Sequence, residues 1–482
     1  MKNDDIINAI GNLDDSTIEE VNKTRKNNKS KKGVWIKVVA VAASVCLVIS
    51  GAWLGFDFFG NQKITAYAIE KAVYPEVPQY PKAINDLTAV VFDNQYDEWW
   101  KSLLERKKLI DGRERSLDSF IYSTAPAFMA NDEVKSKNVI YSPVNVFMAL
   151  SLLSESTGGS SRQQLLRLTG MKDIETLRKT ADAIWNSSYR DDGSATALIS
   201  NSVWLADDFK YNEKTLKALA DNYYASSYSG KMGSEEYNKM LQSWLNEQTD
   251  GLLKDSADNQ SFDPTTVLGL ASTVYFSAKW SSKFSDSLNT EKVFHGADGD
   301  KKTEFMNQKD EAKYYYSDRF AAYFKNFENE AGNICFILPD EGVEVSELFN
   351  DESALKLMSG EKMPDSKFLN INFSVPKFDI DSDIDLCENL KPLGVTDVFD
   401  GEKSDFSPMF ETSGAFVNKI DHAARVMIDE DGCKAAAFTV LSACGAMMPP
   451  DEEVDFVLDR PFIFVINGTN NLPLFIGVVN NV

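Results

Sequence analysis

Histidine and cysteine are both scarce in this sequence, and each scarcity narrows the possible functions. Only two histidines, His295 and His422, occur among 482 residues, so a mechanism that depends on imidazole has very few candidate groups. The five cysteines include no C-x-x-C pair and no spacing typical of a metal site, and they indicate no disulfide framework. We therefore expect neither a metal centre nor a cofactor.

Basic residues are outnumbered by acidic ones. The chain carries 50 Lys and Arg against 73 Asp and Glu, which gives a formal net charge of −23. Such a charge repels phosphate backbones, so nucleic acid is not expected as a partner. Hydrophobic residues make up 43% of the sequence. This share is enough for a large buried core and argues against a disordered chain.

Motifs of hydrolytic enzymes are missing as well. No G-x-S-x-G elbow is present, and S-x-x-K occurs twice, at Ser353 and Ser359, without an accompanying K-T-G. We therefore predict that the protein is not an enzyme and has no catalytic residues. A cell-surface binding or adhesion module remains a competing hypothesis at this point.

One long uncharged run is present near the N-terminus, where "VVAVAASVCLVISGAWLGF" extends from Val38 to Phe56. A helix of this length, at about 1.5 Å per residue, nearly spans a hydrocarbon core of about 30 Å. The stretch before the run is rich in Lys and Arg and has no acid, whereas Asp57 follows it. We predict a cytoplasmic basic leader over residues 1–37, a transmembrane signal anchor over 38–56 and a body outside the cell.

Two alternatives to a retained anchor exist. A cleaved signal peptide would release the body as a secreted protein. Lipidation of Cys46 is disfavoured, because Val45 is too large for a good lipobox and the apolar run continues past the cysteine. Export, few cysteines and a basic leader together favour a bacterial protein of the cell membrane, single-pass with its N-terminus in the cytoplasm.

Beyond the anchor, the composition changes twice. Residues 57–112 are interpreted as a stalk or lead-in, since "YPEVPQYP" (74–81) cannot be helical and an amphipathic helical pattern follows near its end. Residues 113–482 contain no obvious linker. Helical periods come first there and strand-like runs dominate later, which predicts one α+β domain without a parallel doubly wound sheet.

Several segments of this domain resemble the serpin family, in the order in which that family places them. In "NVIYSPVNVFMALSLLSESTGGSSRQQLL", Ser142 and Pro143 connect a strand to a long helix, and "STVYFSAKW" ends in Lys279 and Trp280 as the family's Tyr-Phe-x-Gly-Lys-Trp strand does. Further matches are "SWLNEQTDG", "FHGADGDKKTEFMNQ", "DRPFIF" and "LFIGVV". The resemblance implies a monomer with a large, mostly antiparallel central sheet, helices, smaller sheets and an exposed reactive-centre loop.

The resemblance also implies a group of residues that controls the opening of the central sheet. Its members are Ser142, Pro143, Asn145, Trp280 and His422. Asn145 stands where the family has a serine, and Ser272 stands where the family has an asparagine on the neighbouring strand. The resemblance implies that His422 lies under the sheet and hydrogen-bonds to members of this group such as Asn145, and we favour this structural role over a pH switch.

A run of small residues near the C-terminus resembles the serpin hinge, which begins the reactive-centre loop at about residues 430–450. The residues on the hinge pattern are Glu430, Asp431, Gly432, Cys433, Lys434, Ala435, Ala436, Ala437 and Thr439. The resemblance implies that the loop enters the central sheet as a new strand after cleavage. Because strand side chains alternate between faces, small residues on the inward face would permit this entry.

The position of the cleaved bond follows from family spacing. In the family the bond follows the residue sixteen positions after the first hinge glutamate, which is Ala446 here, so the reactive bond joins Ala446 and Met447. The nearby Pro449 and Pro450 match related loops. An alanine there suits the pocket of elastase-like or subtilisin-like serine proteases and not a trypsin-like pocket. We predict a serine protease inhibitor that acts as a suicide substrate. The alternatives are a plain flexible Ala/Ser-rich loop and a serpin fold that binds or lies at the surface without inhibiting.

Overall fold

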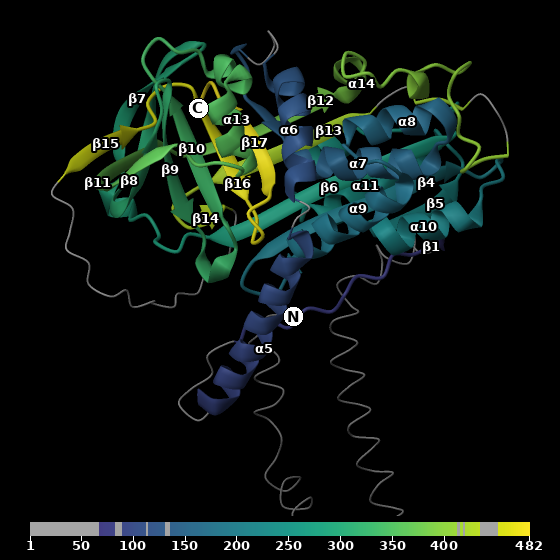
Figure 1. Cartoon of the computed structure of the whole chain (residues 1–482), viewed down its shortest axis with the longest axis horizontal. Coiled ribbons are helices and arrows are strands. Elements are labelled where there is room, and N and C mark those ends of the chain that lie inside the picture. Colours follow the sequence, from purple (N-terminus) through teal and green to yellow (C-terminus); the bar gives the residue numbers. More distant parts are fainter. Residues whose placement is uncertain are drawn as a thin grey trace, which may run out of the picture. The chain divides into compact units, whose positions relative to one another are not determined.

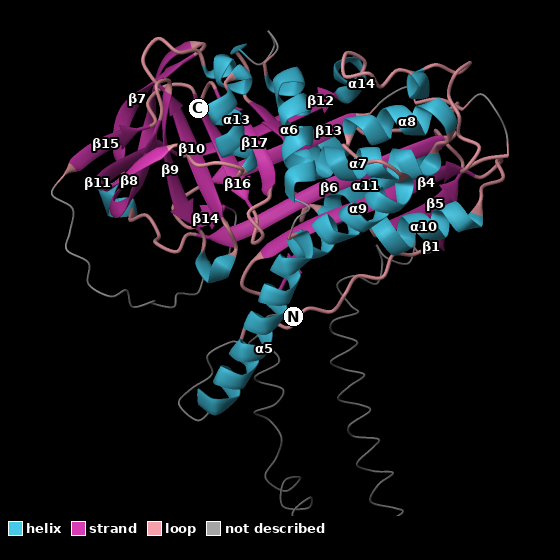
Figure 2. Ribbon diagram, viewed as in Figure 1, coloured by secondary structure: helices cyan, strands magenta, loops and turns pink. Residues whose placement is uncertain are grey.

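The strand-like runs of the sequence form long strands in a computed structural model of the chain (Figure 1, Figure 2). The structure describes residues 67–81, 89–111, 114–130, 135–411, 415–417, 420–433 and 452–482. "TVLGLASTVYF" lies in β6 (Leu268–Lys279), and "GNICFILP" lies in β10 (Asn333–Pro339). Their β-branched and aromatic side chains suit a pleated, half-buried surface, as the pattern predicted.

The main sheet crosses the middle of the folded unit. Its neighbouring strands are, in spatial order, β1 (Ala68–Glu70), β5 (Ala225–Gly230), β4 (Thr196–Ala206), β6, β14 (Gly432–Cys433), β13 (Asp421–Ile428) and β12 (Phe378–Asp385), with β3 (Arg190–Asp191) beside β4. Only β4 and β5 pair in parallel along this described path. The predicted α+β fold with a mostly antiparallel central sheet is confirmed.

A second sheet holds the remaining strands of the described chain. Its spatial order is β15 (Glu453–Val457), β11 (Asp365–Pro376), β8 (Gly299–Tyr316), β9 (Phe320–Asn326), β10, β16 (Phe462–Asn467), β17 (Pro473–Val479) and β2 (Val139–Tyr141), with β7 (Thr290–Gly296) beside β8. The motifs "DRPFIF" and "LFIGVV" supply β16 and β17, whose side chains are entirely buried. These strands therefore lie in the core, as continuous apolar runs predict.

The helices pack mainly around the main sheet (Figure 2). They are α5 (Ala89–Lys107), α6 (Glu114–Met129), α7 (Pro143–Ser156), α8 (Gly159–Leu168), α9 (Ile174–Ser188), α10 (Glu213–Tyr223), α11 (Glu235–Gln248), α12 (Lys254–Ala257), α13 (Glu352–Ser359) and α14 (Leu386–Leu390). Short 3-10 turns lie at Lys108–Ile110, Asp286–Leu288, Glu328–Glu330, Val345–Asn350 and Asp397–Phe399. Both α7 and α11 contact β6.

Helix α7 shows how the sequence sets a helix start. Ser142 is its N-cap, with the hydroxyl oxygen accepting from the backbone N–H of Asn145 at 3.3 Å, and Pro143 occupies the first helical position. A capping hydroxyl satisfies one free donor of the first turn, and proline has no N–H to leave unsatisfied there. Nearly every α7 side chain is buried, so this helix forms part of the core.

Part of the predicted stalk belongs to the folded unit, which extends from Tyr67 to Val482. Strand β1 pairs antiparallel with β5 and so becomes an edge of the main sheet. Tyr74 packs against Trp185 with ring centroids 5.0 Å apart, and Trp99 of α5 is buried, donating from its indole to Asp192 at 2.7 Å. The proline-rich segment 74–81 forms neither a helix nor a strand, and it lies against the body through Tyr74 and Tyr80.

The predicted anchor at 38–56 and the leader at 1–37 lie outside the described residues. Within the described ranges, no helix is long and apolar enough to cross a membrane.

Candidate functional site

The main sheet is interrupted between β6 and β13. Within the described chain these strands are joined through β14, where Gly432 and Cys433 pair with Lys279 and Ala278 on one side and Cys433 pairs with Ile428 on the other. Gly432 has φ +155°, and a Cβ there would lie 2.3 Å from the backbone oxygen of Ala278. Only glycine fits this close approach. The start of the predicted hinge thus lies inside the sheet.

A cavity of about 250 Å³ lies beside the part of β6 that β14 does not reach. Ser272 and Thr273 of β6 line one side, Ala423 of β13 lines another, and Asn145 and Leu150 of α7 also contribute. Thr273 Oγ1 is buried without a hydrogen-bond partner in the described structure. We call this space the slot. Residues of both β6 and β13 line it.

Ser142 and His422 meet near the slot. The backbone N–H of Ser142 donates to His422 Nε2 at 3.0 Å, so this nitrogen carries no proton. The ring is buried, 2% exposed, and packs edge-on against Tyr141. Burial lowers the pKa of His422 from 6.5 to about 4. The imidazole is therefore neutral and holds the start of α7 against β13, with Ser142 rather than Asn145 as its partner.

We expect stability to fall as the pH drops from about 6.5 to about 4, because the unfolded His422 binds a proton that the folded residue excludes. The contribution is present in full above the unfolded pKa and is lost towards the folded one, at about 1.4 kcal/mol per pH unit and roughly 3 kcal/mol in total. For His422→Gln, the free energy of unfolding measured with urea should change less with pH over the same range. An unchanged dependence on pH would contradict the buried neutral state.

Asn145 bridges α7 and β6. Its side-chain amide donates to the backbone oxygen of Ser272 at 2.9 Å, and the Ser272 hydroxyl donates to Asn201 Oδ1 of β4 at 2.7 Å. The Asn201 amide in turn donates to the backbone oxygen of Tyr223 at 2.8 Å. Sequence reasoning noted the exchanged residues Asn145 and Ser272 but missed Asn201, whose only signal was a polar residue within an apolar strand.

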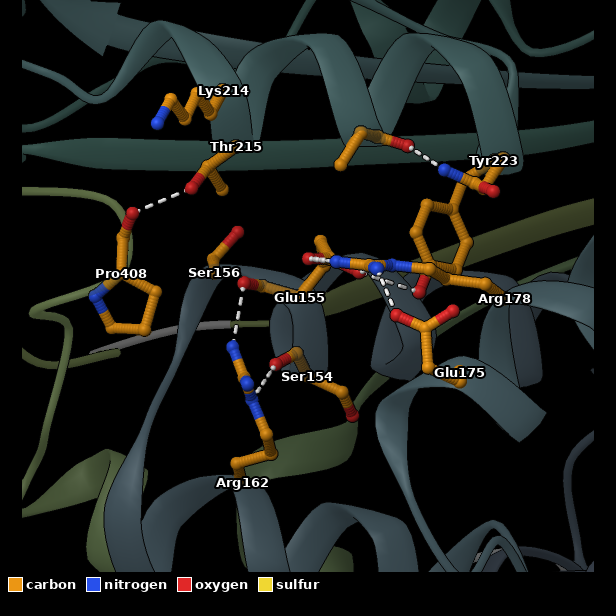
Figure 3. Close-up of polar contacts among 12 residues, drawn as sticks. Ser154, Glu155, Ser156, Arg162, Glu175, Arg178, Lys214, Thr215, Tyr223 and Pro408 are labelled. Carbon is orange, nitrogen blue, oxygen red and sulfur yellow. Dashed lines mark hydrogen bonds and ion pairs between the residues drawn. The ribbon is translucent and has the colours of Figure 1, made fainter.

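A partly buried ion pair, beside Tyr223, joins the far end of α7 to α9 (Figure 3). Glu155 is 3% exposed and accepts two hydrogen bonds from Arg178 of α9, at 2.8 and 2.7 Å. The Tyr223 hydroxyl of α10 donates to the same carboxylate at 3.0 Å. Three helices are therefore joined at one carboxylate. No sequence pattern indicates this cluster, because its members lie far apart along the chain.

Trp280 and Phe284 hold the turn 429–431, at which the hinge begins. The Trp280 indole donates to the backbone oxygen of Asp429 at 2.8 Å, and the Trp280 N–H donates to that of Asp431 at 3.1 Å. The backbone N–H of Phe284 donates to Glu430 at 3.3 Å. Trp280 is fully buried and stacks on Phe327. The predicted tryptophan thus contacts the segment at which the loop begins.

Glu430 is held by two side chains that lie next to strands in the chain, Lys377 after β11 and Asn289 before β7. Lys377 lies 2.6 Å from its carboxylate and 2.6 Å from that of Glu304, and the Asn289 amide donates to Glu430 at 2.5 Å. Burial alone would raise the pKa of Glu430, but the hydrogen bonds from Lys377 and Asn289 outweigh it and lower that pKa. The first hinge residue is therefore a fixed anion, and Lys377 is a member of the site that the sequence did not reveal.

The rest of the loop lies outside the described residues, including Lys434, Ala435, Ala436, Ala437, Thr439, Ala446 and Met447. Cys433, the last described hinge residue, is 4% exposed and its side chain lies in the hydrophobic core. Among the residues that the structure places, no cluster of His, Cys, Asp and Glu is arranged to hold a metal ion.

Comparisons with known proteins agree with this geometry. The family model described as "Serpin (serine protease inhibitor)" matches residues 119–482. Serpin-ZX of Arabidopsis thaliana is 28% identical over 362 residues, which cover 72% of this chain and 92% of that protein. The human leukocyte elastase inhibitor is 26% identical, with coverage of 70% and 92%.

Solved structures show the same fold. The thermophilic serpin tengpin in its native state has a TM-score of 0.69 at 23% identity and covers 86% of this chain and 100% of its own. The Arabidopsis serpin AtSerpin1 in its native stressed conformation has a TM-score of 0.66 at 25% identity, with coverage of 77% and 98%.

Proposed function

This chain belongs to the serpin family of protease inhibitors and is not an enzyme, and from that premise we propose that it traps serine proteases as a suicide substrate cleaved between Ala446 and Met447. The observation that carries the proposal is the two-residue strand β14, which already lies between β6 and β13 beside the slot. A loop that continued from Cys433 along this line would fill the slot as a full strand.

The proposed reaction begins as ordinary proteolysis. The protease serine oxygen attacks the carbonyl carbon of Ala446, the bond to the nitrogen of Met447 breaks, and the leaving amine takes a proton from the protease histidine. The product of this step is an ester between Ala446 and the protease. Water would normally hydrolyse it. Insertion of the freed loop into the slot before hydrolysis would carry the protease away and distort its active site.

Insertion has a sizeable driving force. A ladder of ten or more hydrogen bonds, at about 1 kcal/mol net each, together with apolar burial gives on the order of 10 kcal/mol or more. The buried hydroxyl of Thr273, which has no partner among the described residues, lies beside the slot that the new strand would enter, as does the carbonyl of Ser272, to which Asn145 donates. The uncleaved fold would therefore be metastable, held by kinetics.

The proposed targets are elastase-like or subtilisin-like serine proteases. Ala446 is small and is flanked by Gly445 and Met447, which suits a shallow apolar pocket. Mouse, pig and human relatives at 26 to 28% identity are named leukocyte elastase inhibitors, which is consistent with this choice.

We expect the body, residues 67–482, to form a complex with pancreatic elastase or subtilisin that survives denaturing electrophoresis. Mass spectrometry should show new termini at Ala446 and Met447. The same protease with its serine chemically blocked should give no complex, and Ala446→Arg should transfer the reaction to trypsin. Cleavage without a complex, across a panel of such proteases, would support a non-inhibitory serpin instead.

We also propose that residues 38–56 anchor the protein in a bacterial cell membrane, with residues 1–37 inside and the serpin body outside. The uncharged run and the basic residues before it support this topology. Protease added to intact cells should remove the body and leave an N-terminal tag protected. A tag that is accessible from outside would overturn the topology, and a body found only in the medium would indicate a cleaved signal.

A further inference from the structure

A buried lysine lies behind the turn that begins the loop. Lys325 of β9 has a side chain only 3% exposed. Its ammonium donates to Gln308 Oε1 of β8 at 2.6 Å and lies 3.9 Å from Asp310 Oδ2. A buried cation is costly unless its partners repay the loss of hydration, and here a carboxylate at the edge of ion-pair distance is its one charged neighbour in the described structure.

Aromatic rings supply the rest of its surroundings. The ammonium lies 4.4 Å from the ring centre of Phe284 and 5.5 Å from that of Trp280. Both distances fall within the range of a cation–π interaction, which is strongest away from water. Trp280 donates to the turn 429–431 from its indole ring and from its backbone N–H, and Phe284 donates to it from its backbone N–H. Lys325 therefore contacts the rings of two residues that donate to this turn.

We propose that Lys325 is a positioning residue for loop insertion: its ammonium holds Trp280 and Phe284 in the orientation that keeps Gly432 and Cys433 seated in the main sheet. This role deepens the proposed inhibitory function and depends on it for its biological meaning. Gly432 and Cys433 are the first residues of the strand that the inserted loop would extend. If they detached, insertion would have to begin again from a free loop and would slow relative to hydrolysis of the acyl bond.

The interaction should depend on pH. Burial lowers the pKa of Lys325 to about 8, against the opposing effect of Asp310, so the side chain is mostly charged at pH 7 and mostly neutral at pH 9. The titratable groups around it are Asp310 of β8 and Tyr323 of β9, whose hydroxyl donates to Asp310 at 2.5 Å. Burial raises the pKa of Tyr323 far above this range. On the turn side, Asp431 is paired with Lys283 and Glu430 with Lys377.

Hydrogen–deuterium exchange of the amides at 429–433 tests the proposal without a protease, with the amides of β16 and β17 as the reference within the same molecule. We expect Lys325→Met to lose about tenfold protection of the turn at both pH values. At pH 7 the amides of the turn should be equally protected in wild type and in Lys325→Arg. At pH 9 they should be less protected in wild type, because lysine loses its charge there and arginine keeps it. A merely structural side chain would not produce this difference between wild type and the arginine variant.

The same three proteins then give the moles of inhibitor consumed per mole of protease. This stoichiometry should be equal for wild type and Lys325→Arg at pH 7, and at least about twofold higher for wild type at pH 9. Equal protection of the turn in all three proteins at both pH values would overturn the role of Lys325. The predicted exchange pattern without any trapped protease would keep the positioning role and overturn the inhibitory function instead. If Lys325→Met does not fold, the comparison of turn protection between wild type and Lys325→Arg at pH 7 and pH 9 still tests the role of Lys325.

Discussion

Ala437→Glu should convert the protein from an inhibitor into a substrate. Cys433 faces the core, and strand side chains alternate, so Ala437, four residues on, would face the same way once inserted. A glutamate there would place an unpaired carboxylate in a buried position, at a cost of about 3 to 5 kcal/mol. Insertion would then be slower than hydrolysis of the acyl bond. We expect cleavage at Ala446 with little or no complex, measured as the moles of inhibitor consumed per mole of protease.

Phe438→Glu is the matched control. Residue 438 is adjacent in sequence and would point to the opposite face of the inserted strand, so the same added charge should have a much milder effect. The pair separates strand alternation from a general effect of negative charge on the loop. Equal stoichiometries for the two variants would mean that the inward face has been assigned wrongly.

Arg178→Met should destabilise the native state by about 2 to 4 kcal/mol, because it leaves the carboxylate of Glu155 buried with only Tyr223 as a donor among these partners. This range is below that for a fully buried pair, since the Arg178 side chain is 27% exposed and partly screened by water. Urea unfolding followed by circular dichroism measures the loss. The effect should appear as a lower midpoint, because α7, α9 and α10 are joined at this carboxylate.

Two controls test the cause of that loss. Lys239→Met removes an exposed ion pair with Glu235 and should leave the midpoint unchanged. Glu155→Leu combined with Arg178→Met removes both charges, so no buried carboxylate remains and most of the stability should return. A double variant as unstable as Arg178→Met alone would show that packing, and not the stranded charge, caused the loss.

The sequence was most informative where local patterns decide structure. The strand-like runs and the ordered family motifs, among them Ser142 and Pro143 before a long helix and the segments of β16 and β17, predicted the α+β fold from contiguous residues. Such features depend on neighbouring residues alone, because capping and alternation act within a few positions. Glycine at 432 was likewise marked by the hinge pattern, and the structure adds the 2.3 Å approach that requires it.

The stalk shows the limit of composition. A proline-rich segment with an amphipathic helix after it suggests a spacer, and the structure contains the helix, α5, and no helix in the proline-rich part. Composition cannot show what an extended segment lies against, however. The pairing of β1 with β5 and the burial of Tyr74 and Trp99 depend on surfaces supplied by residues more than a hundred positions away.

By itself the sequence determined the family, the fold class, the hinge pattern and the candidate reactive bond, since each is written in contiguous residues whose order the chain preserves. Only the tertiary structure decided that the Cys433 side chain faces the core and that Ser142, not Asn145, bonds His422. It also placed Lys377 and Asn201 in the site and packed Lys325 against Trp280. Those facts depend on distances between strands and helices far apart in the chain, and burial, which sets the pKa of His422 and Lys325, exists only once these elements have packed together.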